Sequence, residues 1–284
     1  MGQEQDAKLT RRAMLGGVAA GVLAAGPARA AESSWAAIAE SGVMRFGVLQ
    51  SHAPYHNFED GHWVGFAVQM GQDCMQALGT AMNKPLRAEY VETSLATVIL
   101  DIQANKLDLY FGLTDSPARR LAVNLFGPIY ELPECVINTS GFDPGTNWTD
   151  YDKPSVSIAV VLGSTDEQAA RKMLPNATIR SLKSTAEAIL DIQSGNSQAM
   201  VNTVLSGMMA RQKTPNLGDP VVLQPLMSQP SMGGTRRDGD GKLAAFCEEW
   251  ATAYRSSGRA KQAILAAMQH SGLDATKLPP TLRF

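Results

Sequence analysis

Residues 100–112 read LDIQANKLDLYFG, and residues 190–202 read LDIQSGNSQAMVN. In both stretches Leu-Asp-Ile-Gln ends a run whose apolar residues have helical spacing. Asn105 and Gly195 follow shortly after, and these residue types best tolerate the left-handed conformation that ends many helices. A run of strand length comes next in each copy. The repeated order of helix, stop and strand predicts two similar lobes rather than a chance identity.

The rest of the chain alternates between short apolar runs and amphipathic runs, which predicts an α/β fold with mostly parallel sheets. Asp60 and Gly61 supply the turn of an expected hairpin, and the helix that follows is expected to stop near Gly79. Strands are expected at 44–50, 86–92, 155–163 and 177–182, and helices at 68–78, 164–174, 242–256 and 259–270. Residues 141–154 are rich in turn-forming types, and we expect a surface loop there.

The first thirty residues have the pattern of an export signal. Lys8, Arg11 and Arg12 precede an apolar run at 13–25 that is shorter than the roughly 20 residues needed to span a bilayer. Small residues in A-x-A spacing end at Ala30. The arginine pair resembles a twin-arginine signal, with an ordinary secretory signal as the alternative. We predict export to the periplasm and cleavage near Ala30.

Cleavage at that point would leave residues 31–284, which is enough for one large or two modest domains. The full chain has a formal net charge of −2, which becomes −4 without the leader and its four Lys/Arg and two Asp/Glu. This mild acidity argues against nucleic acid or an anionic membrane as the main partner. Neither a glycine-rich phosphate loop nor a G-x-S-x-G motif is present, so we expect no cofactor. A monomer is expected.

The cysteines and histidines do not suggest a metal site. The three cysteines are Cys74, Cys135 and Cys247. Their odd number and wide spacing fit small buried hydrophobic residues, and whether two of them pair stays open. His52 and His56 are four residues apart, but Pro54 between them prevents the helix that would align them as metal ligands.

Four segments recur in the order typical of one family. They are SGVMRFGVLQSHAPYHNFEDGHWVGFAVQM at 41–70, IQANKLDLYFGLTDSPARR at 102–120, VVLGSTDEQAARKMLP at 160–175 and SSGRAKQAILAAM at 256–268. Together they resemble the extracellular solute-binding proteins of family 3, the periplasmic receptors of polar amino-acid ABC transporters. The resemblance covers most of the mature chain.

The resemblance implies the two-lobed periplasmic-binding-protein fold, of the type II-like class. Lobe 1 is then expected at 36–136 plus 236–284, and lobe 2 at 137–235. Two crossover segments, near 135–138 and 233–237, would form the hinge. Each Leu-Asp-Ile-Gln unit should lie in its own lobe, and the two units should not share one continuous sheet.

Thr114 and Arg119 match the family's Thr-x-x-Pro-x-Arg loop. They follow a strand end, where open α/β sheets place their ligands. A guanidinium offers two parallel N–H donors that fit a carboxylate, and a threonine hydroxyl adds a third. The resemblance therefore implies that Arg119 anchors a ligand carboxylate. From the residues alone, a solvated arginine beside Arg120 is the alternative.

Ser164 and Thr165 open a predicted helix directly after Gly163. The free N–H groups at a helix start attract anions, although Ser164 could serve only as the helix cap. If both lobes hold one carboxylate, ligand binding stabilises the closed form by hinge closure. His52 and Tyr55 occupy the aromatic positions of the family's first loop. Either could stack on the ligand, and a core position is the alternative for Tyr55.

The sequence departs from the family at the two acidic positions that face a ligand's ammonium group. Leu49 aligns with the first, and Thr203, next to Asn202, aligns with the second. A buried ammonium without a carboxylate is costly, whereas Thr203 and Asn202 can hydrogen-bond a hydroxyl, keto or amide group. The nearby acids that could substitute are Glu59, Asp115 and Asp166. Whether the ligand carries an ammonium group therefore stays open.

These observations predict a periplasmic receptor that captures a small carboxylate-bearing solute and delivers it to the membrane permease of an ABC transporter. We expect no enzymatic activity, because general acid catalysis needs an acid facing the substrate and Thr203 replaces it. One alternative is an exported enzyme on the same fold, similar to cyclohexadienyl dehydratase. The other is a ligand-sensing receptor without transport.

Overall fold

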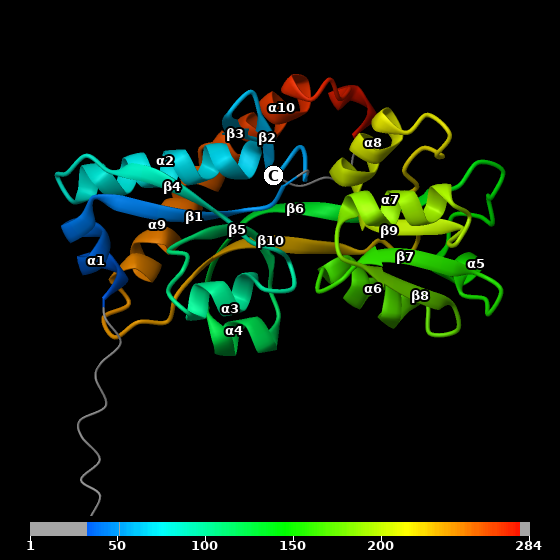
Figure 1. The fold of residues 1–284 in the computed structure, drawn as a ribbon, viewed down its shortest axis with the longest axis horizontal. Coiled ribbons are helices and arrows are strands. Elements are labelled where there is room, and N and C mark those ends of the chain that lie inside the picture. Colours follow the sequence, from blue (N-terminus) through cyan, green and yellow to red (C-terminus); the bar gives the residue numbers. More distant parts are fainter. Residues whose placement is uncertain (1–32, 51, 279–284) are drawn as a thin grey trace, which may run out of the picture. The chain divides into compact units, whose positions relative to one another are not determined.

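The computed structural model describes residues 33–50 and 52–278, and the leader predicted at 1–30 lies outside these ranges. Helices lie against both faces of the sheets (Figure 1). The helices are α1 (Ser34–Ser41), α2 (Phe66–Ala81), α3 (Val98–Gln103), α4 (Pro117–Ala122), α5 (Trp148–Tyr151), α6 (Thr165–Met173), α7 (Thr185–Gln193), α8 (Val204–Lys213), α9 (Lys242–Ser256), α10 (Arg259–His270) and the 3-10 helix η1 (Ala275–Lys277). The strands are β1 (Val43–Val48), β2 (Asn57–Glu59), β3 (His62–Val64), β4 (Arg87–Glu92), β5 (Tyr110–Thr114), β6 (Asn124–Asn138), β7 (Ser157–Val161), β8 (Thr178–Leu182), β9 (Ala199–Thr203) and β10 (Ser228–Thr235).

The first lobe is built on β1, β4 and β5. β1 pairs in parallel with β4, a parallel bridge between Phe46 and Leu109 links β1 to the start of β5, and β5 pairs antiparallel with β10. Met44 and Phe46 pack in a core with residues of α2, α9 and α10. Tyr110 and Leu113 pack on the other side with residues of α3. Helices on both faces explain why β5 is buried on both of its sides.

The second lobe repeats this arrangement with β7 in the centre of three parallel strands, between β8 and β9. Ile158 and Val160 of β7 pack in one cluster with Ala170 of α6. Ala159 points to the opposite face and packs in a second cluster with Ala188 of α7. Alternate residues of one strand thus serve two separate cores.

The two Leu-Asp-Ile-Gln units have the same local structure. Asn105 has φ 58° and Gly195 has φ 73°, so both take the left-handed conformation. In each unit the three residues after the motif donate backbone N–H bonds to the motif's Leu, Ile and Asp carbonyls, in that order. Leu100 is 62% exposed and Leu190 is 60% exposed, whereas both motif isoleucines are buried. The predicted repeat of helix, stop and strand is confirmed.

Strand β6 joins the lobes, and the sequence patterns did not predict it. Residues 124–133 pair with β10 and residues 134–138 pair with β9. The strands β5-β10-β6-β9-β7-β8 therefore form one hydrogen-bonded series. The expectation that the two repeat units share no sheet is wrong, because one long strand serves both lobes in turn. The lobe boundaries themselves stay a prediction.

One local expectation is also wrong. Residues 141–154 are not simply a surface loop, because they contain α5, whose Trp148 is 1% exposed and Tyr151 is 0% exposed in the core of the second lobe. The helix expected to stop near Gly79 ends at Ala81. A side chain at Gly79 would approach the carbonyl oxygen of Lys84 to 2.8 Å, so this glycine permits close packing of the turn after the helix.

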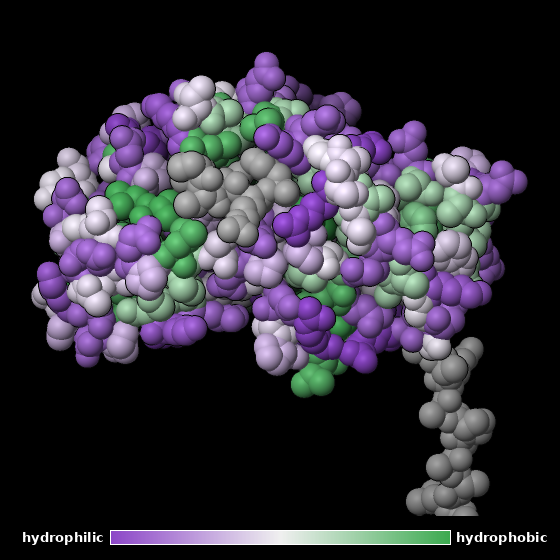
Figure 2. Space-filling model, turned by 180° about the vertical axis from the view of Figure 1, so that it is seen from behind, coloured by the Kyte–Doolittle hydropathy of each residue, from purple (hydrophilic) through white to green (hydrophobic). Residues whose placement is uncertain are grey.

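The three cysteines are buried and form no disulfide with one another, as expected for small hydrophobic residues. Within residues 33–50 and 52–278, no helix has the length and apolar character to cross a bilayer. No group of three or more His, Cys, Asp and Glu with metal-binding geometry occurs in the same ranges. The face in Figure 2 is largely hydrophilic, with separate hydrophobic areas.

Candidate ligand-binding cleft

A cavity of about 70 Å³ lies where elements of the two lobes meet. Its lining combines the segment after β1, the end of β5 and α4 with the start of α6 and the end of β9. All eight predicted ligand-binding residues line it: His52, Tyr55, Thr114, Arg119, Ser164, Thr165, Asn202 and Thr203. The fold therefore brings them together from both halves of the sequence, and their contacts with a ligand stay a prediction.

Arg119 is held by backbone carbonyl groups of both lobes. Its Nη1 donates to the Thr114 carbonyl at 3.1 Å, and its Nη2 donates to the Gly163 carbonyl at 3.4 Å. None of the ion pairs in the described part of the chain includes Arg119. Burial lowers the pKa of this guanidinium, which shows that its charge is partly desolvated. A partly desolvated cation without an anion is suited to a ligand carboxylate.

Arg120 shows the contrast with a solvated arginine. Its guanidinium forms a two-bonded ion pair with Asp115, and its side chain is 56% exposed. The solvated position considered for Arg119 therefore belongs to Arg120.

Threonine and serine side chains connect the lobes beside Arg119. Thr114 Oγ1 donates to Thr165 Oγ1 at 3.1 Å, which joins the end of β5 to the first residue of α6. Ser164 caps α6, because its hydroxyl accepts the Glu167 N–H at 3.0 Å. The capping role considered for Ser164 is thus present, and Ser164 also lines the cavity.

The aromatic loop after β1 closes another side of the cavity. Tyr55 is 6% exposed, its ring centroid lies 4.5 Å from that of Phe66, and its hydroxyl lies 2.7 Å from Thr203 Oγ1. It therefore belongs to the core and to the cavity wall at once. His52 packs on Tyr55, and burial lowers its pKa to about 4, so its ring is neutral at neutral pH. Asn202 is buried, and its Nδ2 has no hydrogen-bond acceptor among the described residues.

Two acids line the cavity, although the family's acidic positions are occupied here by Leu49 and Thr203. Glu134 of β6 pairs in register with Thr203 of β9, is 2% exposed and lines the cavity. Asp166, in the first turn of α6, is 7% exposed and also lines it. Asp166 was among the three substitutes considered, whereas Glu134 was missed. The signal that could have identified Glu134 is its position as an acid within the otherwise apolar run LPECVI.

The other two substitute acids lie elsewhere. Glu59 contacts His270 at 2.8 Å, and Asp115 pairs with Arg120. Neither lines the cavity.

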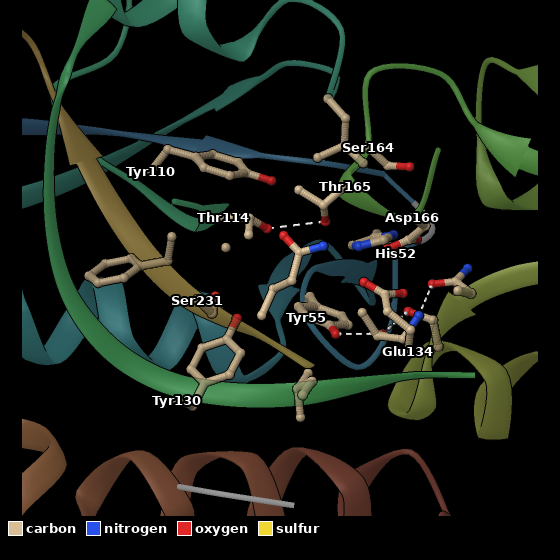
Figure 3. Close-up of a pocket in the computed structure, with 18 of the residues that line it drawn as sticks. His52, Tyr55, Tyr110, Thr114, Tyr130, Glu134, Ser164, Thr165, Asp166 and Ser231 are labelled. Atoms are coloured by element: carbon tan, nitrogen blue, oxygen red, sulfur yellow. Dashed lines mark hydrogen bonds between the residues drawn. The ribbon is translucent and has the colours of Figure 1, made fainter. Parts of the chain in front are cut away.

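The cavity is electrically polar. Tyr110, Thr114 and Tyr130 lie on one side of it, and Glu134 and Asp166 lie on the other (Figure 3). Arg119 belongs to the first side, because it bonds the Thr114 carbonyl and its charge lowers the pKa of Tyr110, although burial raises that pKa overall. A molecule with a carboxylate at one end and a cation at the other fits this separation.

The fold and the cleft define a two-lobed solute-binding protein. The model of the bacterial extracellular solute-binding proteins, family 3, matches residues 44–264, and the chain belongs to this family. No curated protein gives a significant sequence match.

Solved structures agree with this assignment. The ancestral amino acid-binding protein AncCDT-1, a precursor of cyclohexadienyl dehydratase, is 26% identical with a TM-score of 0.72, and the match covers 82% of this chain and 99% of that one. The solute receptor for L-cysteine of Neisseria gonorrhoeae is 21% identical with a TM-score of 0.74, over 89% and 100% of the two chains. The cysteine-binding protein from Campylobacter jejuni is 15% identical with a TM-score of 0.76, over 89% and 99%. The last two show likeness of fold alone.

Proposed function

We propose that this protein captures a small zwitterionic amino acid between its two lobes. The observation that carries the proposal is the polarity of the cavity. Arg119 presents a cation without a protein anion on one side, and Glu134 and Asp166 present two acids without a protein cation on the other. Hydroxyl and aromatic groups make up most of the rest of the lining. The similarity to AncCDT-1, an ancestral amino acid-binding protein, supports this substrate class.

The size of the cavity restricts the side chain of the ligand. An engineered apolar cavity of about 150 Å³ accommodates benzene, and this cavity has a volume of about 70 Å³. In the closed arrangement described here, the ligand is therefore a short amino acid, such as glycine, alanine, serine or cysteine. A long basic or aromatic side chain would require the lobes to stay further apart.

We also propose that the protein works in the periplasm as a monomer and passes its ligand to the membrane permease of an ABC transporter. The family assignment and the leader-like pattern of the first thirty residues support this location. The binding role needs no cofactor and no bond-breaking step.

The direct test is a binding screen on the purified protein without residues 1–30. Calorimetry with glycine, L-alanine, L-serine and L-cysteine should show stoichiometric binding of at least one, and mass spectrometry should recover it unchanged. L-Lactate retains the carboxylate of L-alanine but replaces the ammonium with a hydroxyl. It should bind at least tenfold more weakly than the best amino acid, because the two acids then lack a cation. Tighter binding of lactate than of every amino acid would refute the zwitterion proposal.

One observation favours a second candidate, a dehydratase-like enzyme. Burial and the neighbouring Asp166 raise the pKa of Glu134 well above its usual value, and a protonated acid in a cleft can act as a general acid. The cavity volume argues against a substrate as large as prephenate in the closed form. Incubation with prephenate and arogenate decides between the two, since turnover of either would establish the enzyme.

A further inference from the structure

Glu134 and Asp166 form a buried acid pair that no protein cation neutralises. They come from different elements, β6 and α6, but both line the cavity and lie on the same side of it (Figure 3). None of the ion pairs within the described ranges includes either residue. Glu134 Oε2 is buried on the cavity wall and receives no hydrogen bond from the described residues. The pair therefore differs from a solvated acidic cluster.

Two adjacent carboxylates in such a place cannot both be charged at low cost. Removal from water and mutual repulsion each favour the protonated form of a carboxyl group. One proton shared between the two groups lowers both the cost of desolvation and the repulsion. Burial raises the pKa of Asp166 to about 6. Burial and the charge of Asp166 raise the pKa of Glu134 further above its usual value.

The other groups around the pair do not titrate between pH 5 and 7. On the aromatic loop, His52 has a pKa lowered to about 4 and Tyr55 has a pKa raised well above 10, both mainly because of burial. Burial also raises the pKa of Cys135, which follows Glu134 on β6. The residues facing the pair from β9 and α8 are Asn202, Thr203 and Ser206, which carry no charge. Arg119 stays charged on the far side of the cavity.

We propose that Glu134 and Asp166 share one proton in the ligand-free cleft and release it when the ammonium group of an amino acid enters. This inference rests on the proposed function. The cation stabilises the doubly ionised pair, so the pair binds its proton more weakly in the complex than in the free protein. Ligand capture is then coupled to proton release.

The coupling sets the direction of the pH dependence. The complex holds fewer protons than the free protein. Affinity for the amino acid therefore rises with pH between the pKa of the acid pair in the complex and its pKa in the free protein. Within that window affinity should change by up to about tenfold per pH unit. Above the pKa of the free pair the dependence should disappear, because no proton remains to be released.

Calorimetry measures the released proton directly. Binding of the tightest member of the panel glycine, L-alanine, L-serine and L-cysteine is measured at a pH of about 6 in two buffers with different ionisation enthalpies. The wild-type protein should release close to one proton per bound amino acid. Glu134→Gln should release far less, and Asp166→Asn provides a second variant if the first does not fold. Glu131→Gln is the matched control, because Glu131 lies on the same strand outside the cavity and should leave proton release unchanged.

Infrared spectroscopy tests the free protein without any ligand. The carbonyl stretch of a protonated carboxyl group should be present in the ligand-free wild type, absent from Glu134→Gln, and lost from the wild type on amino-acid binding. Binding without proton release, or a ligand-free protein in which this band is missing, would overturn the inference and leave the proposed function standing. Failure of all four amino acids to bind would instead overturn the proposed function and proton release with it.

Discussion

Arg119 is oriented before any ligand arrives. The Thr114 and Gly163 carbonyls fix its guanidinium from two lobes, and the Ser116 hydroxyl accepts the Arg119 backbone N–H at 3.3 Å. A carbonyl can accept hydrogen bonds but cannot neutralise a charge. A carboxylate that enters the cavity therefore meets a cation whose side-chain entropy is already reduced, and this lowers the cost of binding.

Replacing Arg119 with Ala should weaken amino-acid binding strongly. Loss of one side of a desolvated charge pair costs about 2–5 kcal/mol, which corresponds to roughly 30-fold to several thousand-fold in affinity. Calorimetric titration of the variant with the tightest amino acid of the panel measures this loss.

Arg120→Ala is the control at the neighbouring position. Its pair with Asp115 is exposed to solvent, so it should contribute little to stability and nothing direct to binding. If Arg119→Ala bound as tightly as Arg120→Ala, the assignment of Arg119 as the carboxylate anchor would be wrong.

At the scale of single elements, the ends of α3 and α7 carry the repeat. After each helix a residue takes the left-handed conformation, Asn105 in one unit and Gly195 in the other, and a strand follows, β5 or β9. Asn105 has a second role, because its side-chain oxygen accepts a bond from Arg45 at 3.0 Å. Gly195 has no such side-chain contact, and a Cβ there would meet no atom within 4 Å. A substitution at Gly195 therefore tests the need for the left-handed backbone conformation without a change in side-chain packing.

Gly195→Ala should reduce stability by about 1 kcal/mol, because an L-residue with a Cβ is strained in the left-handed region. For a domain of this size the midpoint of thermal unfolding should fall by roughly 2–4 °C. Gly195→Asn should lose less, since asparagine tolerates this conformation and the other unit uses it. Equal losses for the two variants would show that steric contacts, and not backbone conformation, matter at this position.

At the scale of the whole described structure, a few contacts between side chains hold the cleft closed. Tyr55 bonds Thr203, Thr114 bonds Thr165, and Arg119 reaches the Gly163 carbonyl. A side chain at Gly163 would lie 3.0 Å from the Ala96 Cα, so the backbones of the two lobes approach closely there. These contacts join the two sides of the cleft.

Tyr55→Phe should weaken binding by removing one of these contacts. A hydrogen bond of this kind contributes about 0.5–1.5 kcal/mol, so affinity should fall by roughly 2- to 13-fold, while the Phe66 contact keeps the ring in place. Calorimetry measures affinity, and small-angle scattering shows whether the ligand-free lobes open further.

Tyr90→Phe is a suitable control, because the Tyr90 hydroxyl accepts a bond from Gln72 at 2.8 Å outside the cleft. It should bind like the wild type. An effect as large as that of Tyr55→Phe would mean that closure does not depend on the Tyr55–Thr203 bond.

Features that depend on near neighbours in the chain could be predicted from the sequence. The two repeat units, the hairpin turn at Asp60 and Gly61 and the two closing helices all occur at or near their predicted positions. Their signals are local, because helical spacing, strand alternation and the tolerance of a residue for positive φ act within a few residues. The segment that contains Thr114 and Arg119, from the end of β5 into α4, was identified from its local motif together with the family resemblance.

Features that depend on distant neighbours needed the tertiary structure. The 15 residues of β6 serve two lobes, and no local pattern states where such a strand changes partner. Trp148 stands among turn-forming residues, and only the surrounding fold buries it. The sequence by itself determined the family, the repeat and the segment that brings Thr114 and Arg119 to the cavity. Only the tertiary structure decided that Glu134 and Asp166 line the same side of that cavity, because their proximity depends on how β6 and α6 pack and not on their positions in the chain.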